Sequence, residues 1–187
     1  MELRDIQKFY KEEVLFTKEE CDEILKYCTN PKQTNWTVQL DNEFNEVGCS
    51  LQSQDLGGFY FEHTKWFFDR VMDWSSKMLD VEYLEEIQGS FRKYKEGDYF
   101  IKHKDNVSDG DGNHRFFTIS IQLSEEDSYK GGDVIANNTI KFSKKIGNTI
   151  LWGSDVIHEI KEIKSGERNS IVFFTDKSNL KVKKSLV

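Results

Sequence analysis

Three residues of the types that bind transition metals stand in a suggestive pattern in the second half of the chain. His103 and Asp105 form an His-x-Asp triplet, and His158 follows later. The run Tyr99–His103 predicts a strand, and residues i and i+2 of a strand point to the same face. An imidazole and a carboxylate would then converge, as two neighbouring ligands of an octahedral metal require. His158 lies in a second strand-like run and would supply a third ligand.

This set of residue types indicates which metal the site would suit. Two histidines and one carboxylate on one face of a metal leave three positions open, which suits non-haem Fe(II) because it must hold a co-substrate and dioxygen together. The same residues could hold zinc, although the HExxH motif of metalloproteases is absent. They could also be two histidines buried in a core and an aspartate, Asp105, in a turn. An EF-hand calcium loop at 109–120 is disfavoured, because His114 replaces the required glycine and Ser120 the required glutamate.

A second chemical feature is an arginine just after a turn. Arg168 and Ser170 share one face of a predicted strand that follows Ser165-Gly166, ten residues beyond His158. At about 3.3 Å per residue, a strand, a turn and a returning strand would place Arg168 several ångströms from the metal. That gap fits a short dicarboxylate, since arginine binds carboxylates bidentately and serine adds a hydroxyl group. An ordinary surface arginine in a hairpin explains these residues equally well.

The elements that must position these residues differ between the two halves of the chain. Thr17 and Glu20 form a capping box that predicts a helix ending before Asn30, and an apolar face with helical spacing predicts a second helix over 61–79. From Ile87 onward, short β-rich segments alternate with turns that contain glycine, aspartate, asparagine or serine. This alternation of short strands and turns predicts a sandwich or barrel rather than a parallel sheet.

Composition limits the class of protein. The chain has 187 residues and 13% aromatic residues, which predicts one domain with a packed core. The net charge of −7 argues against nucleic acid as a partner, because proteins that follow a phosphate backbone carry a basic excess.

The cellular compartment is inferred from the cysteines and the N-terminus. Cys21, Cys28 and Cys49 are three in number and form neither a disulfide framework nor a CxxC zinc motif. The charged N-terminus lacks the apolar segment of a signal peptide, and no apolar run approaches the roughly 20 residues of a membrane helix. We therefore expect a soluble, cytoplasmic protein without a membrane partner.

The motifs occur in an order that is typical of one enzyme family. Along the chain stand Tyr94-x-x-Gly97-x-x-Phe100-x-x-His103-x-Asp105, Gly131-Gly132-Asp133, Gly147, His158 and Gly166-Glu167-Arg168-x-Ser170. This ordered set resembles the Fe(II)/2-oxoglutarate-dependent dioxygenases, specifically the prolyl 4-hydroxylase-like branch. The resemblance implies a mainly β fold, a double-stranded β-helix (jelly-roll) core with supporting α-helices. It further implies a single domain over 1–187, with helical support at about 1–86 and a catalytic core at about 87–176.

The resemblance also assigns roles to individual residues. His103, Asp105 and His158 would be the Fe(II) ligands, and Arg168 would hold the distal carboxylate of 2-oxoglutarate, assisted by Tyr94 and by Ser170. Dioxygen would be the other co-substrate, and the family allows ascorbate as an additional cofactor.

The implied activity is hydroxylation of a C–H bond, most simply of prolyl residues in a peptide or protein, with release of succinate and CO2. The chain would work as a monomer or homodimer, and the loop at 105–114 would close over an extended peptide. The net negative charge would favour a neutral or basic peptide.

Three positions depart from the family pattern: Val134, Phe100 and Phe174 stand where threonine, tyrosine and tryptophan are common. Base-demethylating relatives carry a second arginine at the position of Phe174. Two alternatives to peptide hydroxylation remain at this stage: the same chemistry on a free small molecule or nucleobase, and a non-catalytic jelly-roll binding module.

Overall fold

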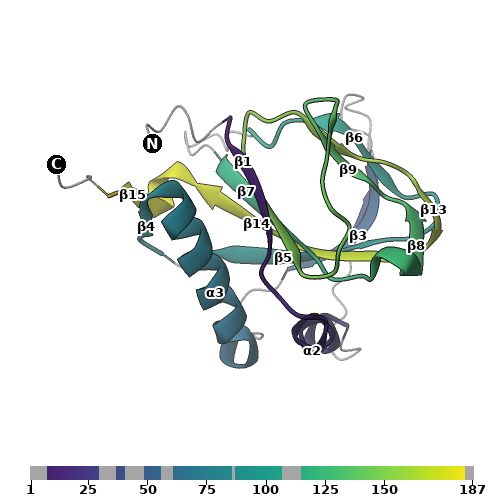
Figure 1. The fold of residues 1–187 in the computed structure, drawn as a ribbon, viewed down its shortest axis with the longest axis horizontal. Coiled ribbons are helices and arrows are strands. Elements are labelled where there is room, and N and C mark those ends of the chain that lie inside the picture. Colours follow the sequence, from purple (N-terminus) through teal and green to yellow (C-terminus); the bar gives the residue numbers. More distant parts are fainter. Residues whose placement is uncertain are drawn as a thin grey trace.

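The computed structural model describes residues 8–29, 37–40, 49–55, 61–85, 87–106 and 115–183. Its main element is one large, strongly curled sheet of eleven strands (Figure 1). Its strands, in spatial order, are β1 (Tyr10–Val14), β11 (Asn148–Gly153), β7 (Arg115–Gln122), β14 (Arg168–Asp176), β5 (Gln88–Tyr94), β3 (Cys49–Asp55), β6 (Tyr99–His103), β12 (His158–Ile160), β9 (Val134–Ala136) and β10 (Ile140–Lys141), with β2 (Thr37–Leu40) paired to β3.

Shorter elements complete the described part of the chain. They are the strand pair β8 (Tyr129–Gly131) and β13 (Ile163–Gly166), the strand pair β4 (Val81–Tyr83) and β15 (Leu180–Val182), the 3-10 turns η2 (Glu126–Ser128) and η3 (Lys177–Asn179), and the helices α2 (Lys18–Cys28) and α3 (Phe61–Leu79).

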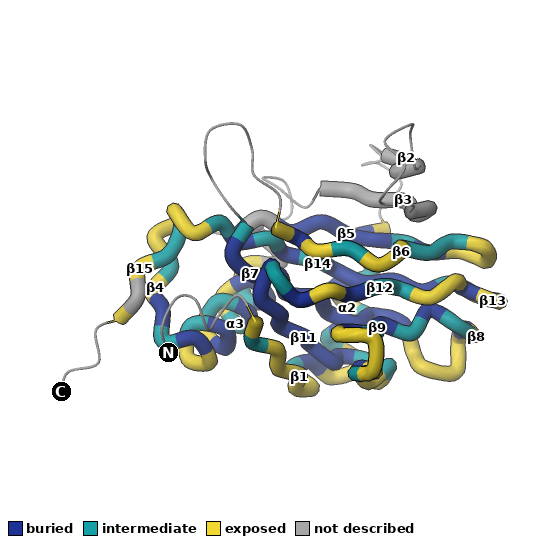
Figure 2. Tube along the Cα trace, turned by 90° about the horizontal axis from the view of Figure 1, so that it is seen from above, coloured by how far each residue is buried: buried dark blue, intermediate teal, exposed yellow. Residues whose placement is uncertain are grey.

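The curl of the sheet comes from its pairing pattern. Strand β3 pairs with β2 along one edge, and along its other edge it pairs with β5 near its end and with β6 near its start. It thereby joins the layer β1-β11-β7-β14-β5 to the layer β6-β12-β9-β10. The strand pair β8-β13 continues the line of β9 and β12. Seen from above, the strands of the sheet run side by side with their axes nearly aligned (Figure 2). The prediction of a mainly β jelly-roll with supporting helices is confirmed.

A pair of glycines allows the bend between β8 and β9. Gly131 and Gly132 have φ angles of 76° and 64°, in the left-handed region that glycine adopts without strain. A Cβ atom on Gly131 would stand 2.1 Å from the carbonyl oxygen of Glu162, and one on Gly132 would stand 3.3 Å from Cδ of Arg168. The bend therefore brings the backbone of Gly132 against the side chain of Arg168.

Both predicted helices are present and cover the outer side of the large sheet (Figure 1). The capping box at the start of α2 is formed as predicted: the Glu20 amide donates to Thr17 Oγ1 at 3.3 Å, and the Thr17 amide donates to Glu20 Oε2 at 3.0 Å. The helices bury Cys21, Phe67 and Val71 in one apolar cluster with the sheet.

Alternation of side chains along the strands gives the large sheet two different faces. In β7, Phe117, Ile119 and Ile121 belong to the apolar cluster beneath the helices. The residues between them, from Thr118 to Gln122, are buried polar side chains on the opposite face. Since side chains alternate along a strand, one strand supplies both the apolar core and a polar interior.

The N-terminal part of the chain contributes strands as well as the two predicted helices. Besides α2 and α3 it supplies the edge strand β1, which pairs with β11, and the bridging strand β3. The sequence of β1, YKEEV, is exposed at every position and shows little apolar alternation. Its strand conformation comes from pairing with β11, which is remote in sequence, so local pattern could not reveal it.

The two described cysteines, Cys21 and Cys28, are buried free thiols, and burial raises the pKa of each to about 12. Among the described residues, no helix combines the length and apolar character needed to cross a membrane. Residues 107–114, most of the predicted closing loop, lie outside the described part of the chain.

Candidate metal centre and co-substrate pocket

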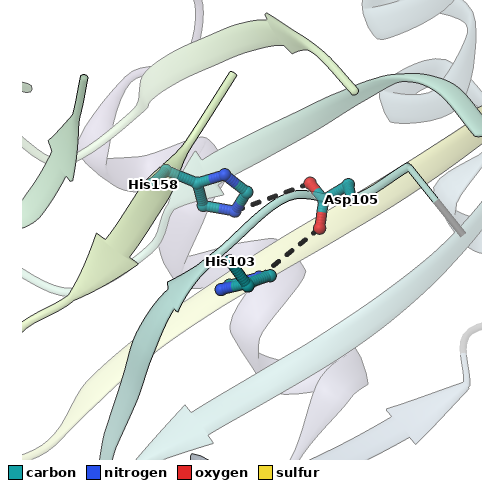
Figure 3. Close-up of side chains that lie close together, drawn as sticks. All are labelled: His103, Asp105 and His158. Atoms are coloured by element: carbon teal, nitrogen blue, oxygen red, sulfur yellow. Dashed lines mark ion pairs between the residues drawn. The ribbon is translucent and has the colours of Figure 1, made fainter. Parts of the chain in front are cut away.

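Strand pairing brings the three predicted ligands together. Strands β6 and β12 are antiparallel neighbours, with His158 directly opposite His103. The ligand atoms of His103, Asp105 and His158 lie within 4.8 Å of one another (Figure 3). Asp105 lies two residues beyond the end of β6 rather than within the strand, and its carboxylate turns back toward both imidazoles.

Hydrogen bonds fix which nitrogen of each imidazole faces the centre. Nδ1 of His103 lies 2.8 Å from the carbonyl oxygen of Ile101, and Nδ1 of His158 lies 3.0 Å from that of Val156. A carbonyl oxygen only accepts, so each Nδ1 carries the proton and donates it. Each Nε2 therefore presents a lone pair to the centre, the arrangement that orients metal-binding histidines.

Asp105 is held by two neighbouring donors that the sequence analysis did not name. Its Oδ2 accepts from Thr118 Oγ1 at 2.7 Å and from Trp152 Nε1 at 2.8 Å. Burial by itself would raise the pKa of Asp105, but His103, His158 and Thr118 outweigh it and hold that pKa below its usual range. The residue is thus kept as a buried, oriented anion.

Aromatic rings enclose the two histidines. Phe100 stacks on His103 with ring centroids 3.8 Å apart, and Trp152 packs against His158 with centroids 4.7 Å apart. Burial lowers the pKa of His158, although Asp105 opposes this effect. The enclosure therefore favours the neutral imidazole, which is the form that binds a metal.

These residues fit a divalent metal ion. Nε2 of His103 and Nε2 of His158 each lie 3.5 Å from a carboxylate oxygen of Asp105. Lone pairs of neutral imidazoles facing a carboxylate repel one another, and a cation between them removes that repulsion. Two imidazoles and one carboxylate with the remaining positions open is the donor set of non-haem Fe(II) sites.

The predicted anion-binding residues form a second buried group. Arg168 is 2% exposed, and its Nη1 donates to Ser170 Oγ at 3.1 Å. Its Cζ lies 5.4 Å from the ring centroid of Tyr94, the residue directly opposite it in β5. Nε of Arg168 has no hydrogen-bond partner, and no carboxylate of the described residues pairs with this side chain.

Tyr129, on β8, is a further neighbour of Arg168 that the sequence analysis missed. Burial raises the pKa of Tyr129, and the nearby positive charge of Arg168 partly offsets this rise. A buried guanidinium surrounded by hydroxyl groups and lacking a carboxylate partner is a fitting receptor for an anionic ligand, because burying an unpaired charge is costly.

A cavity lies beside the candidate metal centre. The three predicted ligands line it, together with Tyr94, Val134, Trp152 and Phe174. Arg168 and Ser170 do not line it; they lie behind Tyr94, further along the same interior face of β14. Val134 and Phe174, two of the departures from the family pattern, both face this space, so its wall is more apolar than the pattern implies.

Part of the chain is similar to one family of known proteins. The family described as the 2OG-Fe(II) oxygenase superfamily matches residues 89–176. A PKHD-type hydroxylase of Shewanella oneidensis is 33% identical over 86 residues, which cover 43% of this chain and 38% of that protein. The chain thus matches only about two fifths of the length of that curated relative. Residues 89–176, just under half of the chain, are thus similar to the 2OG-Fe(II) oxygenase superfamily.

Solved structures show the same fold at low sequence identity. A prolyl hydroxylase from Trichoplax adhaerens, in complex with a peptide fragment of the hypoxia inducible factor oxygen degradation domain, aligns with a TM-score of 0.68 at 16% identity. The alignment covers 95% of this chain and 87% of that one. The carbocyclase SnoK from nogalamycin biosynthesis aligns with a TM-score of 0.72 at 7% identity, covering 98% and 86% of the two chains.

Proposed function

We propose that this chain is an Fe(II)- and 2-oxoglutarate-dependent dioxygenase that hydroxylates prolyl residues of a peptide or protein. The overall reaction converts the C–H bond, 2-oxoglutarate and O2 into C–OH, succinate and CO2. The observation that carries the proposal is the convergence of His103, Asp105 and His158 within 4.8 Å, inside a region that is similar to the 2OG-Fe(II) oxygenase superfamily.

His103, Asp105 and His158 would hold the iron through Nε2, a carboxylate oxygen and Nε2. When bound, iron and 2-oxoglutarate supply the activation of dioxygen that the protein's own side chains lack. Trp152 and Thr118 fix the orientation of Asp105 through its Oδ2. Phe100 packs against the ring of His103 and Trp152 against that of His158, which keeps the two imidazoles oriented.

Arg168 would bind the distal carboxylate of 2-oxoglutarate, with Ser170 and Tyr94 as its helpers. The unpartnered Nε of Arg168 supports this role, because a bound carboxylate would supply the missing acceptor. Tyr129 and the backbone at Gly132 hold the arginine in place. Anchoring the far end of the co-substrate at Arg168 would direct its near end toward the histidines.

The proposal of a peptidyl substrate rests on similarity to known proteins. The Shewanella oneidensis relative is a PKHD-type hydroxylase, and the structure of the Trichoplax adhaerens enzyme contains a peptide. A free small molecule is the competing substrate class, since the fold is shared with the carbocyclase SnoK.

The test is succinate formation by the purified chain with Fe(II), 2-oxoglutarate and O2, with His158→Ala as the matched inactive control. Proline-containing peptides and free amino acids are then offered separately, and products are analysed by mass spectrometry. Addition of one oxygen atom to a peptidyl proline supports the proposal. Turnover of free amino acids or nucleobases alone would reject the peptidyl assignment, and absence of succinate under all conditions would reject the dioxygenase.

A further inference from the structure

Tyr129, on β8, is a buried phenol that packs beside Arg168. Its side chain is 3% exposed and belongs to one cluster with Tyr94 and Ile163. A Cβ atom on Gly132 would stand 3.0 Å from Cε2 of Tyr129 and 3.3 Å from Cδ of Arg168. Because Gly132 has no side chain, both groups approach the same point of the backbone. The edge of the tyrosine ring next to the hydroxyl therefore lies beside the arginine.

The amide of Gln122 makes the phenol oxygen an acceptor. Nε2 of Gln122 donates to the carbonyl oxygen of Ser124 at 3.0 Å and to the hydroxyl of Tyr129 at 3.0 Å. A carbonyl oxygen can only accept, so the amide of Gln122 turns its NH2 group, and not its oxygen, toward both neighbours. The oxygen of Tyr129 thus receives a hydrogen bond from Gln122, and its own proton has to be donated to another group.

Among the described residues, no acceptor receives that proton. The charged groups beside the ring are Arg168 and Lys144, whose Nζ lies 4.1 Å from the ring centroid, and both carry only donors. Burial raises the pKa of Tyr129, so the phenol keeps its proton at neutral pH. A buried O–H group without an acceptor costs free energy, which a bound acceptor would restore.

The donors of Arg168 are in a similar condition. Its Nε is buried without a partner, and its Nη1 donates to Ser170 Oγ at 3.1 Å. Donors thus outnumber acceptors around one buried guanidinium. A carboxylate supplies two acceptor oxygens and also neutralises the charge, so this group of donors suits a carboxylate. The donors lie directly behind Tyr94, which lines the cavity at the metal centre and belongs to the same cluster as Tyr129.

We propose that the Tyr129 hydroxyl donates to the same distal carboxylate of 2-oxoglutarate that Arg168 binds. Tyr129 is then a direct ligand of the co-substrate, and Gln122 is a positioning residue that orients the phenol. The inference rests on the proposed function and deepens it, because it adds a residue that none of the sequence motifs marks. The competing explanation is that Tyr129 only packs against the arginine.

The test separates the two ends of the co-substrate on the intact protein. 2-Oxopentanoate has the same 1-carboxylate, keto group and chain length as 2-oxoglutarate, but a methyl group replaces the distal carboxylate. The chain is loaded with Fe(II) in the absence of O2, and calorimetry measures the affinity for each acid. The ratio of the two affinities reports what the protein gains from the distal carboxylate, and this measurement needs no turnover.

Tyr129→Phe removes the hydroxyl and keeps the ring. It should weaken binding of 2-oxoglutarate roughly 10- to 100-fold, the usual range for a hydrogen bond to a charged group, and leave the affinity for 2-oxopentanoate unchanged. Gln122→Met keeps the phenol but removes the donor that orients it, so it should lower the ratio by a smaller factor. Tyr83→Phe is the matched control, because its hydroxyl meets Ser75 Oγ of α3 at 2.7 Å, away from the site, and it should leave the ratio unchanged.

Circular dichroism establishes that each variant is folded. If Tyr129→Phe does not fold, Gln122→Met decides in its place, and an unchanged ratio in that variant overturns the proposal.

The outcomes distinguish this inference from the proposed function. If the wild-type protein prefers 2-oxoglutarate and Tyr129→Phe keeps the full preference, Tyr129 is not a ligand, while the co-substrate site stands. If Tyr129→Phe weakens the binding of both acids equally, the effect comes from the fold or the metal, and the inference is wrong. If the Fe(II)-loaded wild-type protein binds neither acid, the proposed function fails together with the inference.

Discussion

The two faces of the layer β11-β7-β14 are built from the same strands and have opposite properties. On the outer face Phe117, Ile119 and Phe173 are fully buried beneath the helices. On the inner face Thr118, Ser170 and Arg168 are also almost fully buried, yet they are polar or charged. Burial alone therefore does not distinguish structure from function in this molecule.

The distinction lies in what each buried group contacts. The outer side chains contact other apolar groups, as in the edge-to-face contact of Phe173 with Phe68 at 5.3 Å. The inner side chains converge on one carboxylate and one guanidinium, and the Nε atom of Arg168 lacks a partner. We expect outer substitutions to change the free energy of unfolding and inner substitutions to change ligand binding.

Loss of a metal ligand should produce the largest effect on the inner face. His158→Ala, and separately Asp105→Asn, should abolish stoichiometric Fe(II) binding and succinate formation. Removing a group that only hydrogen-bonds to a metal ligand lowers metal affinity roughly 10- to 100-fold. The loss expected here is larger, because a direct ligand is removed. Metal content measured after gel filtration, with circular dichroism as a control for folding, decides the matter. Full metal occupancy in His158→Ala would contradict the assignment.

On the outer face, Phe173→Ala should destabilise the fold by about 3–5 kcal/mol, because it leaves a cavity between the sheet and α3. The ring of Phe173 lies 5.7 Å from that of Phe67 and 5.3 Å from that of Phe68. Urea unfolding gives the free energy, and Fe(II) affinity is measured on the folded fraction. If Phe173→Ala does not fold, Phe173→Leu provides a milder form of the same test. A change in metal affinity with unchanged stability would reverse the expected roles of the two faces.

The same contrast explains how far the sequence could predict this structure. The strands of the core and the helix over 61–79 were predictable because one face of each is apolar with a fixed period. His103 and Asp105 were predictable because two ligands lie two residues apart in the chain. In β1 the information lies in its pairing partner β11, and the local sequence pattern gave no sign of a strand.

The supporting residues of the site were missed for a similar reason. Thr118 and Trp152 meet Asp105 from strands β7 and β11, and Tyr129 meets Arg168 from β8. Each contact depends on the register between segments that are distant in sequence. The one available signal was the alternation of polar and apolar residues from Phe117 to Gln122, which places Thr118 on the same face as two other polar residues.

The guanidinium group of Arg168, on the inner face, should determine the affinity for 2-oxoglutarate rather than the affinity for Fe(II). Arg168→Gln should weaken 2-oxoglutarate binding by about 2–5 kcal/mol. That is roughly 30-fold to several-thousand-fold at 1.4 kcal/mol per factor of ten. The KM for 2-oxoglutarate in the succinate assay measures the effect. Arg70→Gln is the control, since that guanidinium pairs with Glu20 at 2.7 Å on the helical side. An unchanged KM in Arg168→Gln would remove this residue from the co-substrate site.

The smallest expected effect is the most specific test of the contrast between the two regions. Trp152→Phe keeps an aromatic ring beside His158 but removes the indole N–H that donates to Asp105 Oδ2 at 2.8 Å. Losing one of two donors lets the carboxylate reorient, so Fe(II) affinity should fall about 10- to 100-fold. Trp74→Phe is the matched control, because its indole N–H donates to Glu13 at 2.9 Å outside the site. Trp74→Phe should leave Fe(II) affinity unchanged and lower stability by about 1 kcal/mol, the usual net value of a hydrogen bond. If the two variants bind Fe(II) equally well, Trp152 contributes packing alone and does not position the metal ligand.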